Sequence, residues 1–360
     1  MATRTGGDTI RYGIIGSGMM GGEHMLVLQH VDGAEVVAIA DPVEASLDWG
    51  RACTTPDIWT TNDYLQLLAR DDLDAVVIST PNFTHVDVLN DALATDLAVL
   101  IEKPMCTTVD DCKTVVHQAA QRDALTWVGL QYRYMPTVEA TLTQLATGAC
   151  GTTRMVSIRE HRFPFLKKVG DWNRFSANTG GTLVEKCCHF FDLMRFAAGA
   201  NPERVYASGG QDVNHLDEFY DGKRSDILDN AFVIIDFENG VRGALDLSMF
   251  GEGGRYEQEI TITGDRAKIE TTVPGHRVYL GPRDHSGIQT IDAPMHEDVP
   301  HPDFHQGASY IEHLRFGECL RGGAQPTVTV EDGLWAVAMG AAAHRSIDER
   351  RPVLIDEFDL

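Results

Sequence analysis

Residues 10–41 read IRYGIIGSGMMGGEHMLVLQHVDGAEVVAIAD, and this stretch decides the fold of the first part of the chain. A short apolar run at 12–15 leads into the glycine turn GSGMMG at 16–21. A segment of helical periodicity follows the turn, and a second apolar run at 35–40 ends at Asp41. The order strand, glycine turn, helix, strand and acid is typical of a dinucleotide-binding βαβ unit.

The glycine turn has a physical task at each of its positions. Gly16 makes the tight turn, Gly18 lets the backbone approach a pyrophosphate, and Gly21 lets the helix lie close to the strand. Met19 and Met20 open the helix, whose N-terminal backbone N–H groups then face the phosphates. The competing interpretation is a glycine turn in an ordinary βαβ unit. The strand, the helix and the distal acid together favour the dinucleotide site.

Asp41 indicates which dinucleotide is bound. It follows the second strand at about 20 residues from the turn, where a carboxylate can bind the hydroxyl groups of the adenosine ribose. A carboxylate at this place repels a 2′-phosphate, and Arg51 is the nearest downstream basic residue. The sequence therefore predicts NAD as the cofactor, with NADP the less favoured alternative.

Size and composition limit the class of protein. A chain of 360 residues is long enough for about two domains. The formal net charge of −23 argues against nucleic acid and anionic membranes as partners, because both require basic patches. No apolar run approaches the roughly 18 residues of a membrane span, and the N-terminus lacks the apolar core of a signal peptide. With no CxxC among its cysteines, the chain is expected to be a reduced, cytoplasmic protein.

The alternation of strand and helix continues after Asp41. Apolar runs at 75–79, 98–101 and 126–130 are typical of strands buried on both faces, with helical segments between them. This pattern predicts a Rossmann doubly wound parallel sheet over a first domain, 1–132. Such sheets bind ligands beyond the carboxyl ends of their strands. Side chains that follow these strands are therefore expected to converge: Thr80, Asn82, Glu102, Lys103, Gln131, Tyr132 and Arg133.

The pattern changes in the second part of the chain. Alternating runs that are typical of antiparallel strands occur at 154–162, 231–237, 241–248, 258–263 and 267–271. They predict a separate α+β domain, 133–360, with a large open mixed or antiparallel sheet. One face of that sheet is a candidate for pairing subunits into a homodimer or homotetramer. The last helix, predicted over 330–349, is a candidate to pack back on the first domain.

The segment Glu102-Lys103-Pro104 is the first candidate for chemistry. Pro104 biases Lys103 toward an extended conformation, so the lysine would project from the carboxyl edge of the sheet beside a bound nicotinamide. An ordinary solvated strand end is the competing interpretation.

The second candidate is Glu185 with His189, in a helical segment predicted over 183–197. Residues four apart share one face of a helix, so the two side chains can meet the same ligand. Asp192 is placed to orient the imidazole or to pair elsewhere. A single histidine is more often structural, but a carboxylate one turn earlier favours catalysis. A metal site is a weaker alternative, because neighbouring cysteines point about 100° apart on a helix, and no metal is predicted.

These motifs resemble the glucose–fructose oxidoreductase/inositol dehydrogenase (Gfo/Idh/MocA) family over nearly the whole chain. The resemblance rests on GIIGSGMMG, Asp41, STPNFTH at 79–85, EKP at 102–104, QYRY at 131–134, DWNR at 171–174 and GGTLVEKCCHFFD at 180–192. It implies a nicotinamide-dependent sugar or cyclitol dehydrogenase. It also implies an N-terminal Rossmann domain and a C-terminal open-sheet domain that often forms dimers or tetramers.

The resemblance also implies roles for single residues. Lys103, Glu185 and His189 become the catalytic set. The candidates for cofactor contact are Asn82, His85, Glu102, Trp172 and Arg174. The family usually has Asp, an aliphatic residue and Gly where this chain has Glu185, Lys186 and Cys187, so substrate identity does not carry over. The candidates for the substrate pocket are Tyr132, Arg133, His161, Lys186 and His305.

Oxidation of a secondary alcohol needs a proton acceptor and a hydride acceptor. A histidine ordinarily titrates near pH 6.5 and a lysine near 10.4, so His189 suits the role of base without tuning. Lys103 would then bind the reacting oxygen, and Glu185 would orient His189 or grip a neighbouring hydroxyl. An uncharged pyranose, glycoside or cyclitol is the expected substrate, and Lys186 and Arg133 leave an anionic one open. The alternative function is a catalytically silent regulator that binds NAD and a sugar.

Overall fold

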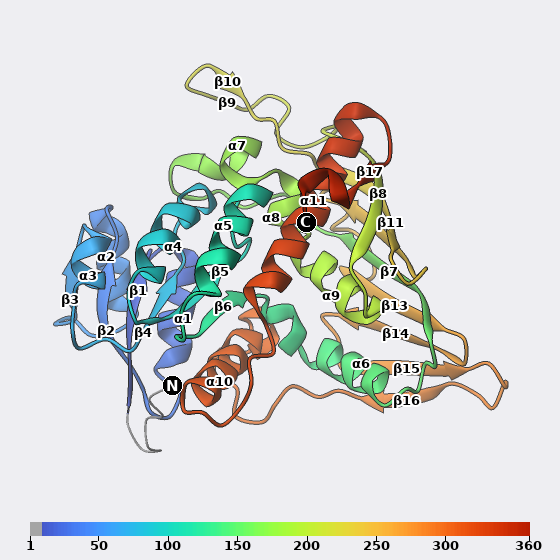
Figure 1. The fold of residues 1–360 in the computed structure, drawn as a ribbon, viewed down its shortest axis with the longest axis horizontal. Helices are drawn as coiled ribbons and strands as arrows, with labels where there is room; N and C mark the ends of the chain where they lie inside the picture. Colours follow the sequence, from blue (N-terminus) through green and yellow to red (C-terminus); the bar gives the residue numbers. More distant parts are fainter. Residues whose placement is uncertain (1–8) are drawn as a thin grey trace. The chain divides into compact units, whose positions relative to one another are not determined.

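The first half of the chain folds into a six-stranded parallel sheet with the strand order β3-β2-β1-β4-β5-β6 (Figure 1). The computed structural model describes residues 9–360, so the N-terminal residues 1–8, on which the signal-peptide expectation partly rests, lie outside the described residues. This strand order is that of a Rossmann fold and confirms the predicted fold class. The strands are β1 (Ile10–Ile15), β2 (Ala34–Ala40), β3 (Trp59–Thr61), β4 (Ala75–Ile78), β5 (Ala98–Glu102) and β6 (Thr126–Gly129).

Burial explains why the central strands read as continuous apolar runs. Every residue of β4 and β5 is buried, as expected for parallel strands covered by helices on both faces. The helices that connect the strands are α1 (Met19–Leu28), α2 (Glu44–Ala52), α3 (Tyr64–Leu68), α4 (His85–Leu93) and α5 (Val109–Ala119).

The chain divides into two compact units. The first contains residues up to Gln131 together with Asp298–Leu334, and the second contains Tyr132–Glu297 together with Trp335–Leu360. The first boundary between the units, after Gln131, lies beside the expected domain boundary between 1–132 and 133–360. The later segment Asp298–Leu334 belongs to the first unit again. This returning segment includes α10 (Ala308–Leu320), which lies beside α1 (Figure 1). The last helix, α11 (Val330–Glu349), contributes to both units.

The second unit contains a nine-stranded sheet with the order β16-β15-β14-β13-β7-β12-β11-β8-β17. Neighbouring strands are antiparallel except for β7 and β12, which are parallel, so the predicted open mixed sheet is confirmed. The strands are β7 (Thr153–His161), β8 (Pro202–Gly210), β11 (Asn230–Phe237), β12 (Arg242–Ser248), β13 (Gln258–Gly264), β14 (Ala267–Val273), β15 (Arg277–Pro282), β16 (Gln289–Asp292) and β17 (Val353–Leu354).

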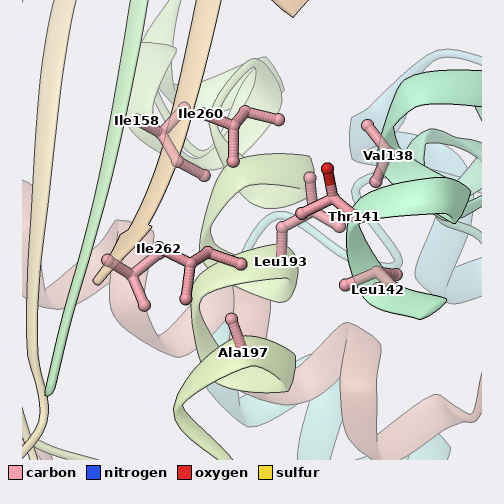
Figure 2. Close-up of a pocket in the computed structure, with 9 residues that line it drawn as sticks. Val138, Thr141, Leu142, Ile158, Leu193, Ala197, Ile260 and Ile262 are labelled. Atoms are coloured by element: carbon pink, nitrogen blue, oxygen red, sulfur yellow. The ribbon is translucent and has the colours of Figure 1, made fainter. Parts of the chain in front are cut away.

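One face of this sheet forms the core of the second unit. Two helices, α6 (Pro136–Ala146) and α9 (Cys188–Ala198), pack against it. Figure 2 shows Leu193 and Ala197 of α9 facing Ile158, Ile260 and Ile262 of the sheet around a small apolar cavity. The alternation of buried and exposed residues along β7 and β13 places these side chains on the covered face.

No helix within residues 9–360 is long and apolar enough to cross a membrane.

Candidate active site

The glycine turn of the first unit is shaped by close backbone contacts. Gly16 has φ +90°, and a Cβ atom added to it would lie 2.8 Å from the backbone of Ser79. A Cβ atom on Gly21 would lie 2.1 Å from the carbonyl oxygen of Gly16, so only glycine lets α1 start this close to β1. A Cβ atom on Gly18 would meet nothing within 4 Å in the described part of the chain. The open side of the turn therefore lies at Gly18.

Asp41 is held against this turn by its own hydrogen bonds. Its Oδ2 atom accepts the backbone N–H of Ser17 at 2.8 Å, and its Oδ1 atom accepts that of Val43 at 2.9 Å. A carboxylate can accept about four hydrogen bonds, so acceptor capacity remains for two ribose hydroxyls. The acid at the end of β2 is thus oriented beside the turn, where the sequence predicts it.

Three buried polar atoms follow the carboxyl ends of three strands of this sheet. They are the hydroxyl oxygen of Ser17 after β1, the amide nitrogen of Asn82 after β4 and the amide oxygen of Gln131 after β6. None has a hydrogen-bond partner within residues 9–360. Buried polar groups are normally paired, so these atoms fit a ligand that brings hydroxyl, amide and phosphate groups, as NAD does.

His85 engages both of its ring nitrogens inside the first unit. Its Nδ1 atom lies 2.8 Å from the carbonyl oxygen of Pro104, and its Nε2 atom lies 2.9 Å from that of Thr80. Burial lowers the pKa of His85. The side chain, expected at the cofactor, thus ties the segment after β4 to the segment after β5. The Thr80 hydroxyl accepts a hydrogen bond from Thr84.

Glu102 is a buried carboxylate that anchors Lys103. Its Oε2 atom accepts the backbone N–H of Lys103 at 3.1 Å, and its Oε1 atom lies 3.1 Å from Nε2 of His24 in α1. Burial alone would raise the pKa of Glu102, but the hydrogen bond from His24 and the charge of Lys103 lower it to about 2. Glu102 is therefore ionised at neutral pH and holds the start of the EKP segment, whose Lys103–Pro104 peptide is cis.

The helix acid and the histidine lie in the second unit, on two short helices rather than on one. The continuous helix expected over 183–197 is wrong, because α8 (Thr182–Glu185) ends before α9 begins at Cys188. Cys187, with φ −90° and ψ −2°, adopts the bridge conformation that ends the helical periodicity. The N-terminus of α8 is capped from far away in sequence, since Nε2 of His344 accepts the backbone N–H of Leu183 at 3.0 Å.

His189 lies in the first turn of α9 and is 2% exposed. Its ring stacks on that of Tyr132, with centroids 4.3 Å apart and an angle of 19° between the planes. The Tyr132 hydroxyl accepts a hydrogen bond from Gln258 at 2.8 Å. Asp192 pairs elsewhere, because its Oδ2 atom accepts from Nε of Arg133 at 2.7 Å. The imidazole is thus positioned by an aromatic neighbour, whereas Glu185 is buried on the preceding helix.

Each charged candidate for the substrate pocket faces a carboxylate. Lys186 Nζ lies 3.0 Å from Glu160, which also approaches Arg162, and His161 Nε2 lies 3.1 Å from Asp246. Burial would lower the pKa of Lys186, but the charge of Glu160 raises it.

Of the predicted substrate residues, the structure brings Tyr132 and Lys186 together, and Tyr132 also stacks on His189. The Lys186 ammonium lies 5.8 Å from the centre of the Tyr132 ring. His305 belongs to the first unit, where its Nδ1 atom lies 2.8 Å from Glu23.

The two expected cofactor contacts from the second unit each have a partner within that unit. Arg174 is 1% exposed, and its Nε atom donates to Glu218 at 2.9 Å. The Trp172 ring lies under the Lys168 ammonium, 5.3 Å from its centre. Within residues 9–360 no group of three or more His, Cys, Asp or Glu side chains is arranged to hold a metal ion.

Four residues with contacts near the candidate residues were not predicted from the sequence: His24, His313, Gln258 and His344. His24 contacts Glu102 and His313, Gln258 donates to Tyr132, and His344 accepts from Leu183. His24 carried a local signal, because it is a polar residue in the mostly apolar stretch that opens α1. The others act on partners that are distant in sequence, and no local pattern marks them.

Comparison with known protein families matches both halves of the chain. Residues 10–130 match the model of the Gfo/Idh/MocA family described as "Oxidoreductase family, NAD-binding Rossmann fold". Residues 143–355 match the model described as "Oxidoreductase family, C-terminal alpha/beta domain". The first part of the chain is therefore an NAD-binding Rossmann domain, as the sequence predicts.

Individual relatives align over almost the whole chain. Myo-inositol 2-dehydrogenase of Thermotoga maritima is 27% identical over 357 residues, covering 97% of this chain and 99% of the relative. The scyllo-inositol 2-dehydrogenase (NAD(+)) of Bacillus subtilis is 24% identical over 353 residues, covering 96% of each. The crystal structure of levoglucosan dehydrogenase in complex with NADH and levoglucosan has a TM-score of 0.84 at 19% identity, covering 97% of this chain and 100% of that one.

Proposed function

This chain belongs to the Gfo/Idh/MocA oxidoreductase family, and on that premise we propose that it uses NAD to oxidise a secondary hydroxyl group of a sugar, glycoside or cyclitol, or to catalyse the reverse reduction. The observation that carries the proposal is the buried His189, stacked on Tyr132, in a chain whose first unit holds Lys103 at the end of a dinucleotide-binding sheet. The names of the relatives support inositols and anhydrosugars as the first substrates to try.

The residues of the first unit have a binding role in this proposal. The glycine turn with Met19 and Met20, the carboxylate of Asp41 and the polar groups of Ser17, Asn82 and Gln131 would hold NAD. When bound, NAD supplies the hydride acceptor of the reaction.

His189 takes the hydroxyl proton of the substrate, and a neutral imidazole can do so at physiological pH. The ammonium of Lys103 donates a hydrogen bond to the same oxygen and stabilises the negative charge that develops there. Glu102 holds the backbone of Lys103 for this task. Glu185, buried on α8, orients His189 or a neighbouring hydroxyl of the substrate. In the reverse direction His189 returns the proton.

Assembly into a homodimer or homotetramer is part of the proposal. The outer face of the large sheet exposes apolar side chains that lie on neighbouring strands: Phe232 is 65% exposed, Ile234 53%, and Tyr206, which pairs with Ile234, 45%. Apolar patches of this kind mark surfaces for protein contacts. Light scattering during size-exclusion chromatography measures the oligomeric state, and a chain that remains monomeric would contradict this part.

The test of the activity is reduction of NAD, followed at 340 nm, with a panel of inositols, pyranoses, anhydrosugars and glycosides. We expect at least one of them to be oxidised. With that substrate, His189→Asn should lower kcat by roughly 10² to 10⁴-fold, while the control His117→Asn, exposed on α5, leaves it unchanged. A protein that binds NAD and a sugar in calorimetry but reduces NAD with none of the panel would instead be the silent regulator. Near-normal turnover in Lys103→Met would contradict the role given to Lys103.

A further inference from the structure

A chain of three buried side chains runs behind the EKP segment, entirely within the first unit. Glu102 at the end of β5 faces Nε2 of His24 at 3.1 Å, and Nδ1 of His24 faces Nε2 of His313 in α10 at 2.9 Å. Glu102 is 4% exposed, and the two histidines are fully buried. Three segments that are far apart in sequence therefore meet in one hydrogen-bonded chain.

The protons of this chain can be assigned from its ends. An ionised carboxylate only accepts hydrogen bonds, so Nε2 of His24 carries a proton and donates it to Glu102. A neutral His24 then presents an unprotonated Nδ1, which accepts the N–H of His313 Nε2. The Nδ1 atom of His313 is left without a proton and without a partner within residues 9–360. A buried acceptor without a partner is less rare than a buried N–H without one, so this assignment is the consistent one.

Glu102, at one end of this hydrogen-bonded chain, also contacts the backbone of Lys103. The second oxygen of Glu102 accepts the backbone N–H of Lys103 at 3.1 Å, so the carboxylate joins the histidines to the residue whose ammonium acts in the proposed reaction. Aromatic rings pack near His313, and the neighbouring Glu312 is a buried carboxyl group whose pKa is raised by burial and by the charge of Glu102. The ring of Tyr12 meets that of His313 edge-on with centroids 6.0 Å apart, and Phe316, one turn further along α10, packs on Tyr12.

We propose that His313 is a positioning residue, which acts through His24 and Glu102 to keep Lys103 in place for reaction. The proposal rests on the proposed dehydrogenase function. A donor at position 313 fixes the ring of His24, the fixed ring fixes the carboxylate, and the carboxylate fixes the backbone that carries the ammonium. Displacement of a catalytic group by about 1 Å can cost about a hundredfold in rate, so a distant buried donor can matter.

The test compares three variants at position 313 and a control on the same helix. His313→Gln keeps a side-chain N–H that can reach His24 and should keep kcat within about threefold of the wild type. His313→Leu removes the donor and should lower kcat by about tenfold to a hundredfold, with the affinity for NAD kept within about threefold. Phe316→Leu removes core volume without changing a member of the hydrogen-bonded chain. When it is assayed well below the unfolding temperature of the variant, its kcat should stay near that of the wild type. If His313→Leu does not fold, His313→Asn, whose shorter amide cannot reach His24, takes its place with the same expected loss.

A double variant separates this inference from the proposed function. If His313 acts through Lys103, His313→Leu adds no further loss of kcat to Lys103→Met. Equal losses in His313→Leu and Phe316→Leu, no loss in His313→Leu, or additive losses in the double variant would each overturn the positioning role. By contrast, an unimpaired Lys103→Met would overturn the proposed reaction itself, whatever the variants at 313 do.

Discussion

The ring of Tyr132 lies flat on the imidazole of His189, with centroids 4.3 Å apart and planes inclined by 19°. Tyr132 follows β6, and His189 lies in the first turn of α9, so the contact joins the QYRY motif at 131–134 to the GGTLVEKCCHFFD motif at 180–192. The hydroxyl of Tyr132 is itself tied to Gln258 at 2.8 Å, and Gln258 also donates to Glu160. The proposed proton acceptor is therefore oriented by a ring that the sheet holds in place.

Replacing Tyr132 tests this orientation. Tyr132→Phe keeps the stacked ring and loses only the bond to Gln258, so kcat should fall by no more than about threefold. Tyr132→Leu removes the ring that orients His189, and kcat should fall by about tenfold to a hundredfold. Steady-state kinetics on the best substrate of the panel measures both. Equal activity of the two variants would show that the stack has no orienting role.

Substitution by alanine at two glycines of the turn should change different properties of the protein: NAD affinity at Gly18 and stability at Gly21. Gly18→Ala places a methyl group in open space, so the free energy of unfolding should change by less than about 0.5 kcal/mol. Its NAD affinity should nevertheless fall by at least about tenfold, because the methyl group occupies the side from which a pyrophosphate approaches.

Gly21→Ala should instead cost about 1–3 kcal/mol of stability, because its methyl group meets the Gly16 carbonyl at 2.1 Å. Urea unfolding and NAD titration separate the two effects. A Gly18→Ala protein that binds NAD with wild-type affinity would contradict the assignment of the glycine turn as the site of the NAD pyrophosphate.

Asp41 should set the preference for NAD over NADP. We expect kcat/KM for NAD to exceed that for NADP by about a hundredfold, since the carboxylate repels a 2′-phosphate. Asp41→Asn removes the charge and keeps an acceptor oxygen for the backbone of Ser17 or Val43, so the ratio should narrow by about tenfold. The exposed Asp57→Asn makes the same change of net charge elsewhere and should leave the ratio as it is. A ratio that moves equally in both variants would refute a local role for Asp41.

His344 should make the stability of the protein depend on pH. Burial lowers its pKa to about 4, from an ordinary value near 6.5, while its Nε2 atom accepts the N–H of Leu183. At pH values between these two pKa values, His344 binds a proton in the unfolded protein but not in the folded protein. The free energy of unfolding therefore falls as the pH falls from about 6.5 to about 4. The loss attributable to His344 is on the order of 3 kcal/mol.

The variant His344→Gln isolates this contribution. Its amide oxygen can still accept from Leu183 but does not titrate. We expect urea unfolding between pH 4 and 7.5 to show a shallower fall of the free energy of unfolding in the variant than in the wild type. Parallel curves would contradict the assignment, because the other buried histidines are the same in both proteins.

The amino-acid sequence alone is sufficient to predict the Rossmann fold of the first half and to place most of the candidate residues after the strands of its sheet. The glycine turn and Asp41 are recognisable because their roles depend on local backbone geometry and on short, fixed spacings. Buried parallel strands likewise appear as continuous apolar runs, and the side chains after β4, β5 and β6 follow from them. The large mixed sheet is predictable for the same reason, since each half-buried strand shows its alternation locally.

Only the tertiary structure decided which partners these residues have. Lys186 and Arg133 read in sequence as cations available to a substrate, but they face Glu160 and Asp192. The return of Asp298–Leu334 to the first unit brings His313 to His24, which no spacing could indicate. Hydrogen bonds and ion pairs between distant segments depend on how helices and strands pack. Packing is determined by the whole chain at once, whereas a motif is determined by its few neighbouring residues.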